Sequence, residues 1–177
     1  MKTIITTDGK EVLIREIVPN DAESSISFSK QIFGLPTVLT TLNEFNQTVE
    51  SQTKWIDSFQ KSDTKFALVA IHENEVVGLL DFSTIRRERL SHIGDFGVSV
   101  LPGFQKNGIA RTMIQMLLDW ALKNPKVEKV NLKVSSNNPK AVRLYESLGF
   151  EKEGQMKNEI KLEDGTYVDT ILMGQFV

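Results

Sequence analysis

The feature that most constrains the fold of this chain is a segment, residues 109–123, that is apolar around most of a helical circumference. Its polar positions recur every fourth residue as one narrow stripe, made of Arg111, Gln115, Asp119 and Lys123. A helix with so little polar surface is buried on most of its sides. The segment before it, residues 92–100, alternates apolar and polar residues with the period of a strand. Together the two segments predict a helix packed against a sheet, and therefore an α/β fold.

Strand and helix patterns alternate along the whole chain. Strands are expected at residues 11–17, 65–71, 76–85, 92–100, 129–134, 150–162 and 166–177. Helices are expected at residues 21–34, capped by Asn20 or Asp21, and at 42–62, 109–123 and 138–149. No repeat, low-complexity tract or linker rich in Pro, Gly and Ser divides the 177 residues. We therefore expect a single domain over residues 1–177.

Charge and composition exclude several classes of function. The formal net charge is -2, so the chain as a whole is not suited to bind nucleic acid or an anionic membrane. The absence of cysteine excludes disulfides, thiolate metal sites and an acyl-enzyme on a protein thiol. The two histidines lack a metal-binding spacing, so no metal is expected. The lack of a long apolar run, at the N-terminus or elsewhere, predicts a soluble cytoplasmic protein.

The stretch between the predicted strand and helix, SVLPGFQKNGIA, has the character of an anion-binding loop. Pro102 ends the strand because it has no backbone N–H for the ladder. The first turn of the helix then leaves amide N–H groups unpaired, and Gly108 lets an anion approach them closely. The predicted pyrophosphate cradle consists of Gln105, Lys106, Asn107, Gly108, Ile109 and Ala110. An ordinary loop that leads into a buried helix is the alternative.

Two ordered motifs resemble those of the GNAT acetyltransferase family. Gln105-x-x-Gly108-x-Ala110 resembles the acetyl-CoA signature Q/R-x-x-G-x-G/A, with Ala110 in place of the second glycine. NNPKAVRLYESLGF resembles N-x-x-A-x-x-L-Y-x-x-x-G-F, from Asn138 to Phe150. The likeness covers nearly the whole chain and is nearest to the ribosomal-protein and polyamine acetyltransferases. It implies a single GNAT-like α/β (α+β) domain, with a mixed, mostly antiparallel central sheet and helices on both faces.

The resemblance implies how acetyl-CoA, the acyl donor, is bound. The residues expected to bind its pantetheine arm, as an added strand would, are Val98, Ser99 and Val100. Asn138 is expected to hydrogen-bond the cofactor while it caps its own helix, and Tyr145 to lie at the thioester end. No metal takes part in this arrangement.

The resemblance also implies two catalytic residues. Asp95 stands where many family members carry a glutamate base, and it would remove a proton from the acceptor amine. The alternative is that Asp95 is a solvated carboxylate on the polar face of its strand, without a catalytic role. Tyr145 falls at the tyrosine position of the second motif, and it would protonate the departing thiolate, with core packing as the alternative. Because no cysteine is present, the acetyl group is expected to pass directly to the acceptor in a ternary complex.

The sequence therefore predicts an acetyl-CoA-dependent N-acetyltransferase that acts on a primary amine, either a small metabolite or a protein N-terminus. The alternative is a non-catalytic sensor that binds an acyl-CoA without doing chemistry. The sequence leaves the identity of the acceptor open, and also whether the chain forms a homodimer.

Overall fold

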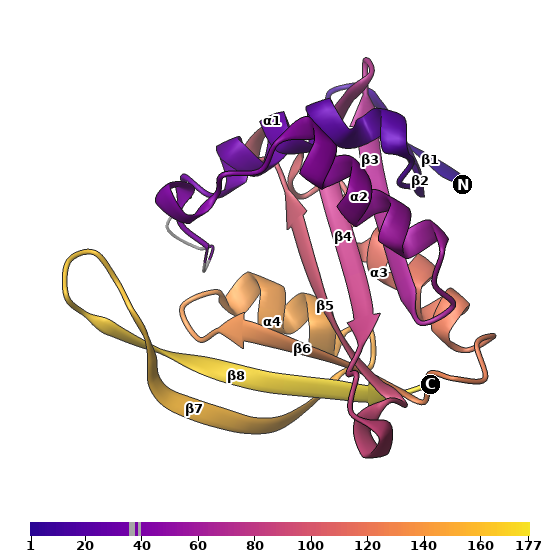
Figure 1. Ribbon diagram of the computed structural model, residues 1–177. Helices are drawn as coiled ribbons and strands as arrows, with labels where there is room; N and C mark the ends of the chain where they lie inside the picture. The colour runs from indigo at the N-terminus through magenta and orange to yellow at the C-terminus, as the bar shows by residue number, and fades with distance from the viewer. Residues whose placement is uncertain (36–37, 39) are drawn as a thin grey trace.

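The computed structural model describes residues 1–35, 38 and 40–177. Its strands are β1 (Lys2–Ile5), β2 (Glu11–Glu16), β3 (Lys65–His72), β4 (Glu75–Thr84), β5 (Ile93–Val100), β6 (Lys129–Ser135), β7 (Glu151–Lys161) and β8 (Tyr167–Phe176). Its α-helices are α1 (Ala22–Ile32), α2 (Val49–Gln60), α3 (Ile109–Ala121) and α4 (Pro139–Glu146). Within the described residues, the eight strands form one sheet in the order β1-β2-β3-β4-β5-β6-β8-β7 (Figure 1).

The pairing of β5 with β6 is the one parallel step in this sheet, among the strands that the structure describes. The two strands are in register only from Ile93 to Asp95, opposite Lys129 to Asn131. Beyond that point β5 continues beside β4 while β6 continues beside β8, so the two strands diverge (Figure 1). The divergence leaves the second half of β5 with a strand partner on one side only.

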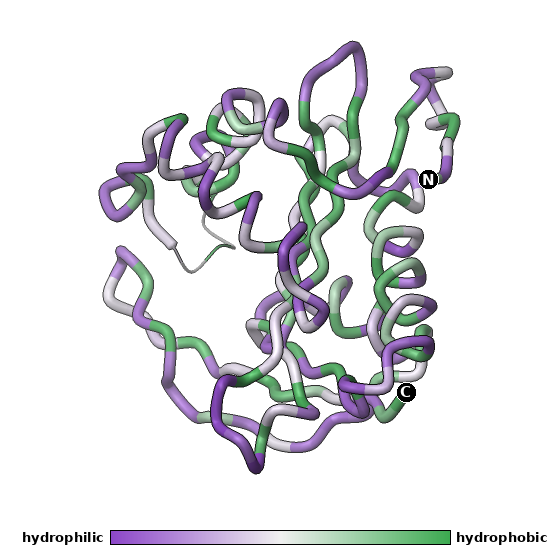
Figure 2. The backbone as a smooth tube through the Cα atoms, turned by 45° about the vertical axis from the view of Figure 1, so that its right-hand side comes forward, coloured by the Kyte–Doolittle hydropathy of each residue, from purple (hydrophilic) through white to green (hydrophobic). Residues whose placement is uncertain are grey.

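Two hydrophobic clusters cover the two faces of the sheet. Strand β3 shows the division, because Phe66 and Leu68 belong to one cluster while Ala67 and Val69 belong to the other. The first cluster includes the buried sides of α3 and α4, and the second includes those of α1 and α2. Figure 2 shows the central strands mostly hydrophobic and several connecting turns hydrophilic. The predicted mixed sheet with helices on both faces is therefore confirmed.

Several predicted elements have the expected bounds for local reasons. Helix α3 begins after Gly108, and its stripe residues are exposed while its other sides are half-buried or buried, apart from the exposed Leu122 just after its end. Helix α4 is capped by Asn138, whose Oδ1 accepts a hydrogen bond from the Ala141 N–H at 3.2 Å. Gly149 follows it with a φ of 95°, a conformation that glycine adopts without strain. The β3–β4 and β7–β8 hairpins are confirmed as well.

Two predictions near the N-terminus are wrong. The strand predicted as the first, at residues 11–17, is the second strand of the sheet. β1 precedes it and pairs with it across a turn at Asp8 and Gly9. The second helix begins at Val49 instead of residue 42, and Leu42–Glu44 form a separate 3-10 turn. Thr48 explains the later start, because its side chain accepts a hydrogen bond from the Ser51 N–H and caps α2 there.

The predicted cap of the first helix also differs in detail. Asp21 occupies the N-cap position of α1, but its side chain makes no capping hydrogen bond to the helix. Its carboxylate instead accepts hydrogen bonds from the Val18 N–H at 2.8 Å and from both terminal nitrogens of Arg15, at 2.7 and 2.8 Å. Asp21 therefore ties the end of β2 to the start of α1. Within the described residues, no helix is long and apolar enough to cross a membrane.

Candidate functional site

A cavity of about 430 Å³ lies where the free edge of β5, the start of α3 and the side of α4 meet. Its lining residues are Val98, Val100, Phe104, Gln105, Lys106, Gly108, Ile109, Ala110, Arg111, Asn138, Lys140, Ala141, Leu144 and Tyr145. Most of the residues predicted to bind the cofactor are in this set. The structure thus brings together segments that lie more than forty residues apart in the chain. Three predicted residues, Asp95, Ser99 and Asn107, do not line the cavity.

The start of α3 supplies unpaired backbone donors to the cavity. Gly108 is the N-cap residue, with a φ of 79° that glycine adopts without strain. The first hydrogen bond within the helix runs from the Thr112 N–H to the Gly108 carbonyl at 2.9 Å. The N–H groups of Ile109, Ala110 and Arg111 therefore precede any intrahelical partner. A Cβ placed on Gly108 would meet no atom of the described residues within 4 Å, so open space lies in front of these donors.

Three cationic side chains surround this helix start. Lys106, Arg111 and Lys140 all line the cavity. Arg111 is fixed by a hydrogen bond from its Nη2 to the Ser147 Oγ at 2.7 Å, which links α3 to the end of α4. The positive charges and the helix dipole act in the same direction, so the site favours a polyanion. The sequence predicts a role for Lys106 alone; Arg111 and Lys140 were missed because each looks like an ordinary exposed helix residue.

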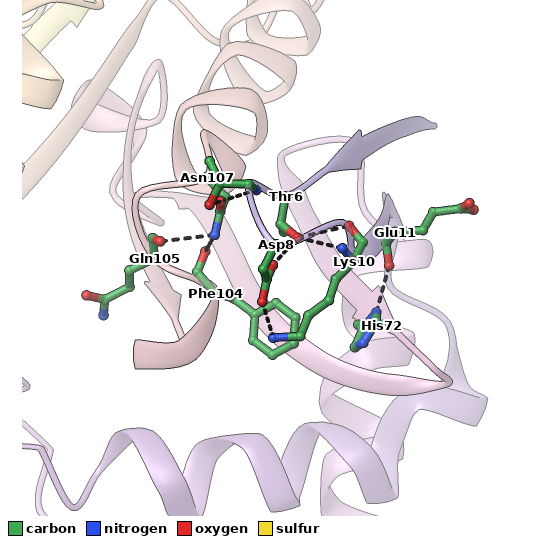
Figure 3. Close-up of polar contacts among 9 residues, drawn as sticks. Thr6, Asp8, Lys10, Glu11, His72, Phe104, Gln105 and Asn107 are labelled. Atoms are coloured by element: carbon green, nitrogen blue, oxygen red, sulfur yellow. Dashed lines mark hydrogen bonds and ion pairs between the residues drawn. The ribbon is translucent and has the colours of Figure 1, made fainter.

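A hydrogen-bonded brace holds the loop that precedes α3, and Figure 3 shows it. The Asn107 Oδ1 accepts hydrogen bonds from the Thr7 N–H at 2.9 Å and the Thr7 hydroxyl at 3.0 Å. The Asn107 Nδ2 donates to the carbonyls of Phe104 and Gln105, at 3.3 and 3.1 Å. The side chain of Asn107 thereby links the cavity loop to the β1–β2 turn. It supports the cradle from outside instead of facing the cavity.

The free edge of β5 presents backbone groups to the cavity. The Leu101 N–H donates to the Val77 carbonyl, and the Ile85 N–H to the Ile93 carbonyl, each at 2.9 Å. In an antiparallel ladder this places the odd-numbered residues of β5 in hydrogen-bonded pairs with β4 and turns the even-numbered residues to the other side. The backbone of Val98 therefore faces the open side. Ser99 is opposite Leu79, so its backbone is directed toward β4.

Val100 and Gln105 are hydrogen-bonded to each other at the C-terminal end of β5. The Gln105 Nε2 donates to the Val100 carbonyl at 3.0 Å, so one acceptor at the strand end already has a partner. The Gln105 side chain therefore stabilises the turn between β5 and α3 while also lining the cavity. The Val100 N–H remains directed to the open side, two residues from that of Val98.

Tyr145 on α4 contributes to both the core and the cavity. Its ring packs edge-to-face against Phe96 and Phe150, with centroids 6.0 Å apart in each case. Burial raises the pKa of its phenol to about 12, so the hydroxyl is protonated at neutral pH. Its side chain also lines the cavity together with Val98. Packing and cavity contact are thus compatible, and the two alternatives weighed for this residue do not exclude each other.

The two acidic residues near this edge differ in environment. Asp95 is exposed and lies at the last position where β5 pairs with β6, opposite Asn131. Asp81 on β4 lies opposite Gly97 and is half-buried, and its partial burial raises the pKa of its carboxyl to about 6. Asp81 is not among the residues predicted from the sequence. The signal that could have found it is one acidic residue inside the apolar strand VVGLLDFSTI.

Comparisons with known proteins agree with this geometry. Residues 35–150 match the acetyltransferase (GNAT) family. The chain is 31% identical over 169 residues to the L-amino acid N-acetyltransferase AaaT of Escherichia coli (strain K12), covering 93% of this chain and 98% of that one. It is 31% identical over 125 residues to the spermidine N(1)-acetyltransferase of Vibrio cholerae serotype O1, covering 71% and 69%. An acetyltransferase of the GNAT family from Streptococcus pneumoniae superposes with a TM-score of 0.89 at 25% identity, covering 94% and 99%.

Proposed function

The chain belongs to the GNAT acetyltransferase family and is an acetyl-CoA-dependent N-acetyltransferase, and from that premise we propose that it transfers the acetyl group directly to a primary amine in a ternary complex. The observation that carries the proposal is the single cavity shared by the start of α3, the free β5 edge and Tyr145. The same cavity thus offers backbone donors and positive charges for a polyanion, and a phenol. The absence of cysteine favours direct transfer over a thiol-bound intermediate.

The residues of the cavity fit acetyl-CoA in charge and in the hydrogen-bonding groups they offer. The pyrophosphate would be held by the N–H groups at the start of α3, with Lys106, Arg111 and Lys140 as counter-charges. The pantetheine amides would pair with the backbone of Val98 and the N–H of Val100, as an added strand does. Asn138 keeps its Nδ2 group for the cofactor, because its Oδ1 caps α4. Acetyl-CoA supplies an activated acetyl group as a thioester.

The proposed chemistry needs one proton acceptor and one proton donor. An alkylammonium has a pKa of roughly 10, so a carboxylate must take a proton before the nitrogen can attack. Asp95 is the carboxylate that the family resemblance indicates. The amine nitrogen then forms a bond to the acetyl carbon as the carbon–sulfur bond breaks and the electron pair leaves on sulfur. Tyr145 donates its proton to that sulfur, and its hydroxyl is restored by the second proton that the nitrogen loses.

The acceptor is proposed to be a small amine metabolite or a protein N-terminus. One relative is an L-amino acid acetyltransferase and another a spermidine acetyltransferase, and both acceptors carry a primary amine. The sensor alternative has no use for Tyr145 at the end of the cavity, so the catalytic function is favoured. A cytoplasmic location and a single domain over residues 1–177 complete the proposal; nucleic acid and membranes have no part in it.

The activity is tested by the release of free thiol from acetyl-CoA in the presence of L-amino acids, spermidine and a short peptide with a free N-terminus. We expect turnover with at least one of these amines. Hydrolysis at the same rate without any amine, or no release at all, would contradict N-acetyl transfer and support the sensor.

The location of the cofactor is tested separately with Gly108→Glu. This substitution puts a negative charge and a strained backbone at the start of α3, so coenzyme A affinity should fall by at least tenfold in calorimetric titration. Gly103→Glu is the matched control, because Gly103 lies in the same loop, has open space around it and does not line the cavity. Gly108→Ala separates backbone strain from charge. Unchanged binding by folded Gly108→Glu would place the cofactor elsewhere.

A further inference from the structure

On the sheet face that α1 and α2 cover, free space lies beside Gly97. Gly97 is exposed, and a Cβ built on it would lie 3.7 Å from the Asp81 Oδ1 and within 4 Å of no other described residue outside its chain neighbours. Asp81 and Gly97 are directly opposite each other in the β4–β5 ladder. A small chemical group placed next to Gly97 on this face would therefore contact the Asp81 carboxylate. It would meet no other described side chain of the neighbouring strands.

This open position adjoins the cavity. Asp95 is the last residue of β5 that pairs with β6, and Gly97 is the next residue on the same face. Val98 follows at once, and its backbone is directed to the open edge where Tyr145 also contributes. Val98, which lines the cavity, is thus next in the chain to Gly97, beside which the Asp81 carboxylate lies. An acceptor that approaches from the α1–α2 face reaches the strand edge at Gly97.

The surroundings of Asp81 leave its carboxylate without a partner among the described residues. No hydrogen bond or ion pair to Asp81 occurs there, and burial alone raises its pKa to about 6. From β3 the nearest charged residue on this face is Lys65, two positions from Ala67, and its Nζ is bound to the Ser58 hydroxyl at 3.1 Å. From β5 the nearest charged residue on this face is Asp95. The buried residues of α1 and α2 carry no charge.

A half-buried carboxylate without a partner opposes folding, so its presence needs a reason outside stability. From Val76 to Phe82, Asp81 is the one residue of β4 with a polar side chain, and it is half-buried like its same-face neighbours Leu79 and Ser83. A carboxyl whose pKa lies near 6 is ionised at neutral pH and is a stronger base than one at the ordinary 3.8. These are the properties that a general base for an ammonium requires.

We propose that Asp81, rather than Asp95, is the general base that deprotonates the acceptor amine, an inference that rests on the proposed N-acetyl transfer. The ammonium group lies over Gly97 and gives one proton to an Asp81 carboxylate oxygen. The nitrogen lone pair so released forms the bond to the acetyl carbon, and the carbon–sulfur bond breaks with its electron pair leaving on sulfur, which Tyr145 protonates. The second proton that the nitrogen loses restores the Tyr145 hydroxyl, and Asp81 passes its proton to water. Asp95 lies two residues before Gly97 on the same face and is exposed to solvent, whereas Asp81 is directly opposite Gly97 and its carboxylate lies beside that position.

The pH dependence of kcat/KM with acetyl-CoA and spermidine, or the best amine of the panel, tests this role. For the native protein we expect kcat/KM to fall below about pH 6, where Asp81 becomes protonated. Asp81→Asn should lower kcat/KM by on the order of 10² at pH 7 and lose that acid limb. The defect should shrink toward about pH 10, where the amine loses its proton unaided. Asp81→Glu should restore part of the rate.

A control variant and a comparison of coenzyme A binding complete the test. Asp119→Asn makes the same substitution on the exposed stripe of α3 and should leave both the rate and the pH profile unchanged. Coenzyme A affinity should be equal in Asp81→Asn and the native protein. An Asp81→Asn variant that keeps the rate and the acid limb, or that raises only the KM of the amine, would overturn this role.

Loss of the acid limb in Asp95→Asn, with Asp81→Asn unaffected, would likewise return the base to Asp95. Each of these outcomes leaves N-acetyl transfer intact. Absence of turnover by the native protein on every amine would instead overturn the proposed function and this role together.

Discussion

At the scale of single residues, Tyr145 is the side chain on which the proposed chemistry depends most directly. Its ring is fixed by Phe96 and Phe150, so the hydroxyl is held in place by packing and not by a flexible contact. A phenol with a pKa of about 12 is protonated at neutral pH, so its hydroxyl is present as a donor when negative charge develops on the sulfur. A fixed, protonated donor suits the role of general acid.

Tyr145→Phe removes one oxygen and keeps the packed ring. We expect the maximal rate to fall at least tenfold, equal to a barrier increase of about 1.4 kcal/mol or more, because the hydroxyl acts when charge develops on sulfur. Acetyl-CoA binding should weaken little. Tyr167→Phe is the matched control, since Tyr167 is 55% exposed on β8 and does not line the cavity. Equal maximal rates for all three proteins, with chemistry rate-limiting, would leave water as the proton donor.

Asp81 affects stability as well as the proposed catalysis, and the sign follows from its raised pKa. The carboxyl titrates at 3.8 when unfolded and at about 6 when folded, so the folded state binds its proton more tightly. Its contribution to stability is therefore greatest below pH 3.8 and is lost as pH rises toward about 6. Asp81→Asn removes this dependence. The gain in unfolding free energy of the variant over the native protein should be larger at pH 7 than at pH 4, by up to about 3 kcal/mol.

Urea unfolding of both proteins at the two pH values measures this difference, and the other titrating groups cancel in the comparison. A difference that does not change with pH would mean that the Asp81 carboxyl is better solvated than its position in the sheet implies.

At the scale of elements, the loop before α3 depends on the β1–β2 hairpin. Asn107 receives two hydrogen bonds from Thr7 and gives two to its own loop, so one side chain couples elements 100 residues apart. Lys10, in the same hairpin, lies over the Phe104 ring with its Nζ 5.1 Å from the centroid. These contacts fix the loop that leads into α3 (Figure 3), and the first residues of that helix line the cavity.

Asn107→Ala tests this brace. Loss of the side-chain hydrogen bonds should loosen the loop and raise the KM for acetyl-CoA by about tenfold, the equivalent of about 1.4 kcal/mol, with little change in kcat. Asn124→Ala is the matched control, because Asn124 likewise ties two loops, through the Asp63 carbonyl, at a distance from the cavity. A KM that rises equally in both variants would reduce the effect to general destabilisation.

At the scale of the whole molecule, one sheet joins two cores that serve different parts of the proposed reaction. The α3–α4 side holds the cavity, while the α1–α2 side bears Asp81 and the open position at Gly97. The divergence of β5 from β6 brings the two sides together at one strand edge. A donor and an acceptor could thus reach the same backbone segment from opposite faces and be bound at the same time, and direct transfer requires simultaneous binding.

If residues 1–177 form a single domain, the two cores should unfold together. Thermal unfolding followed by calorimetry should then show one transition with equal calorimetric and van't Hoff enthalpies. Coenzyme A at about one hundred times its dissociation constant should stabilise the whole transition by about 2.7 kcal/mol. Two transitions, of which coenzyme A moves only one, would show that the α1–α2 layer unfolds apart from the cavity side.

The sequence by itself determined the features that depend on neighbours in the chain. Pro102 and Gly108 set the end of β5 and the start of α3, and Asn138 and Gly149 bound α4, because caps and backbone constraints act within a few residues. The two motifs were enough to indicate the family and most of the cavity residues. The predicted start of α2 was wrong because the prediction followed the apolar spacing from residue 42 onward instead of the capping residue Thr48.

Only the tertiary structure decided which groups meet. The register of β4 against β5 places Asp81 over Gly97 and directs the Ser99 backbone away from the cavity, and neither follows from the alternation within one strand. The turn at Thr7 reaches Asn107 only because β1 pairs with β2, a strand pairing that the sequence did not reveal. Burial, and with it the pKa of Asp81, is a property of everything packed around a side chain, which no stretch of neighbouring residues specifies.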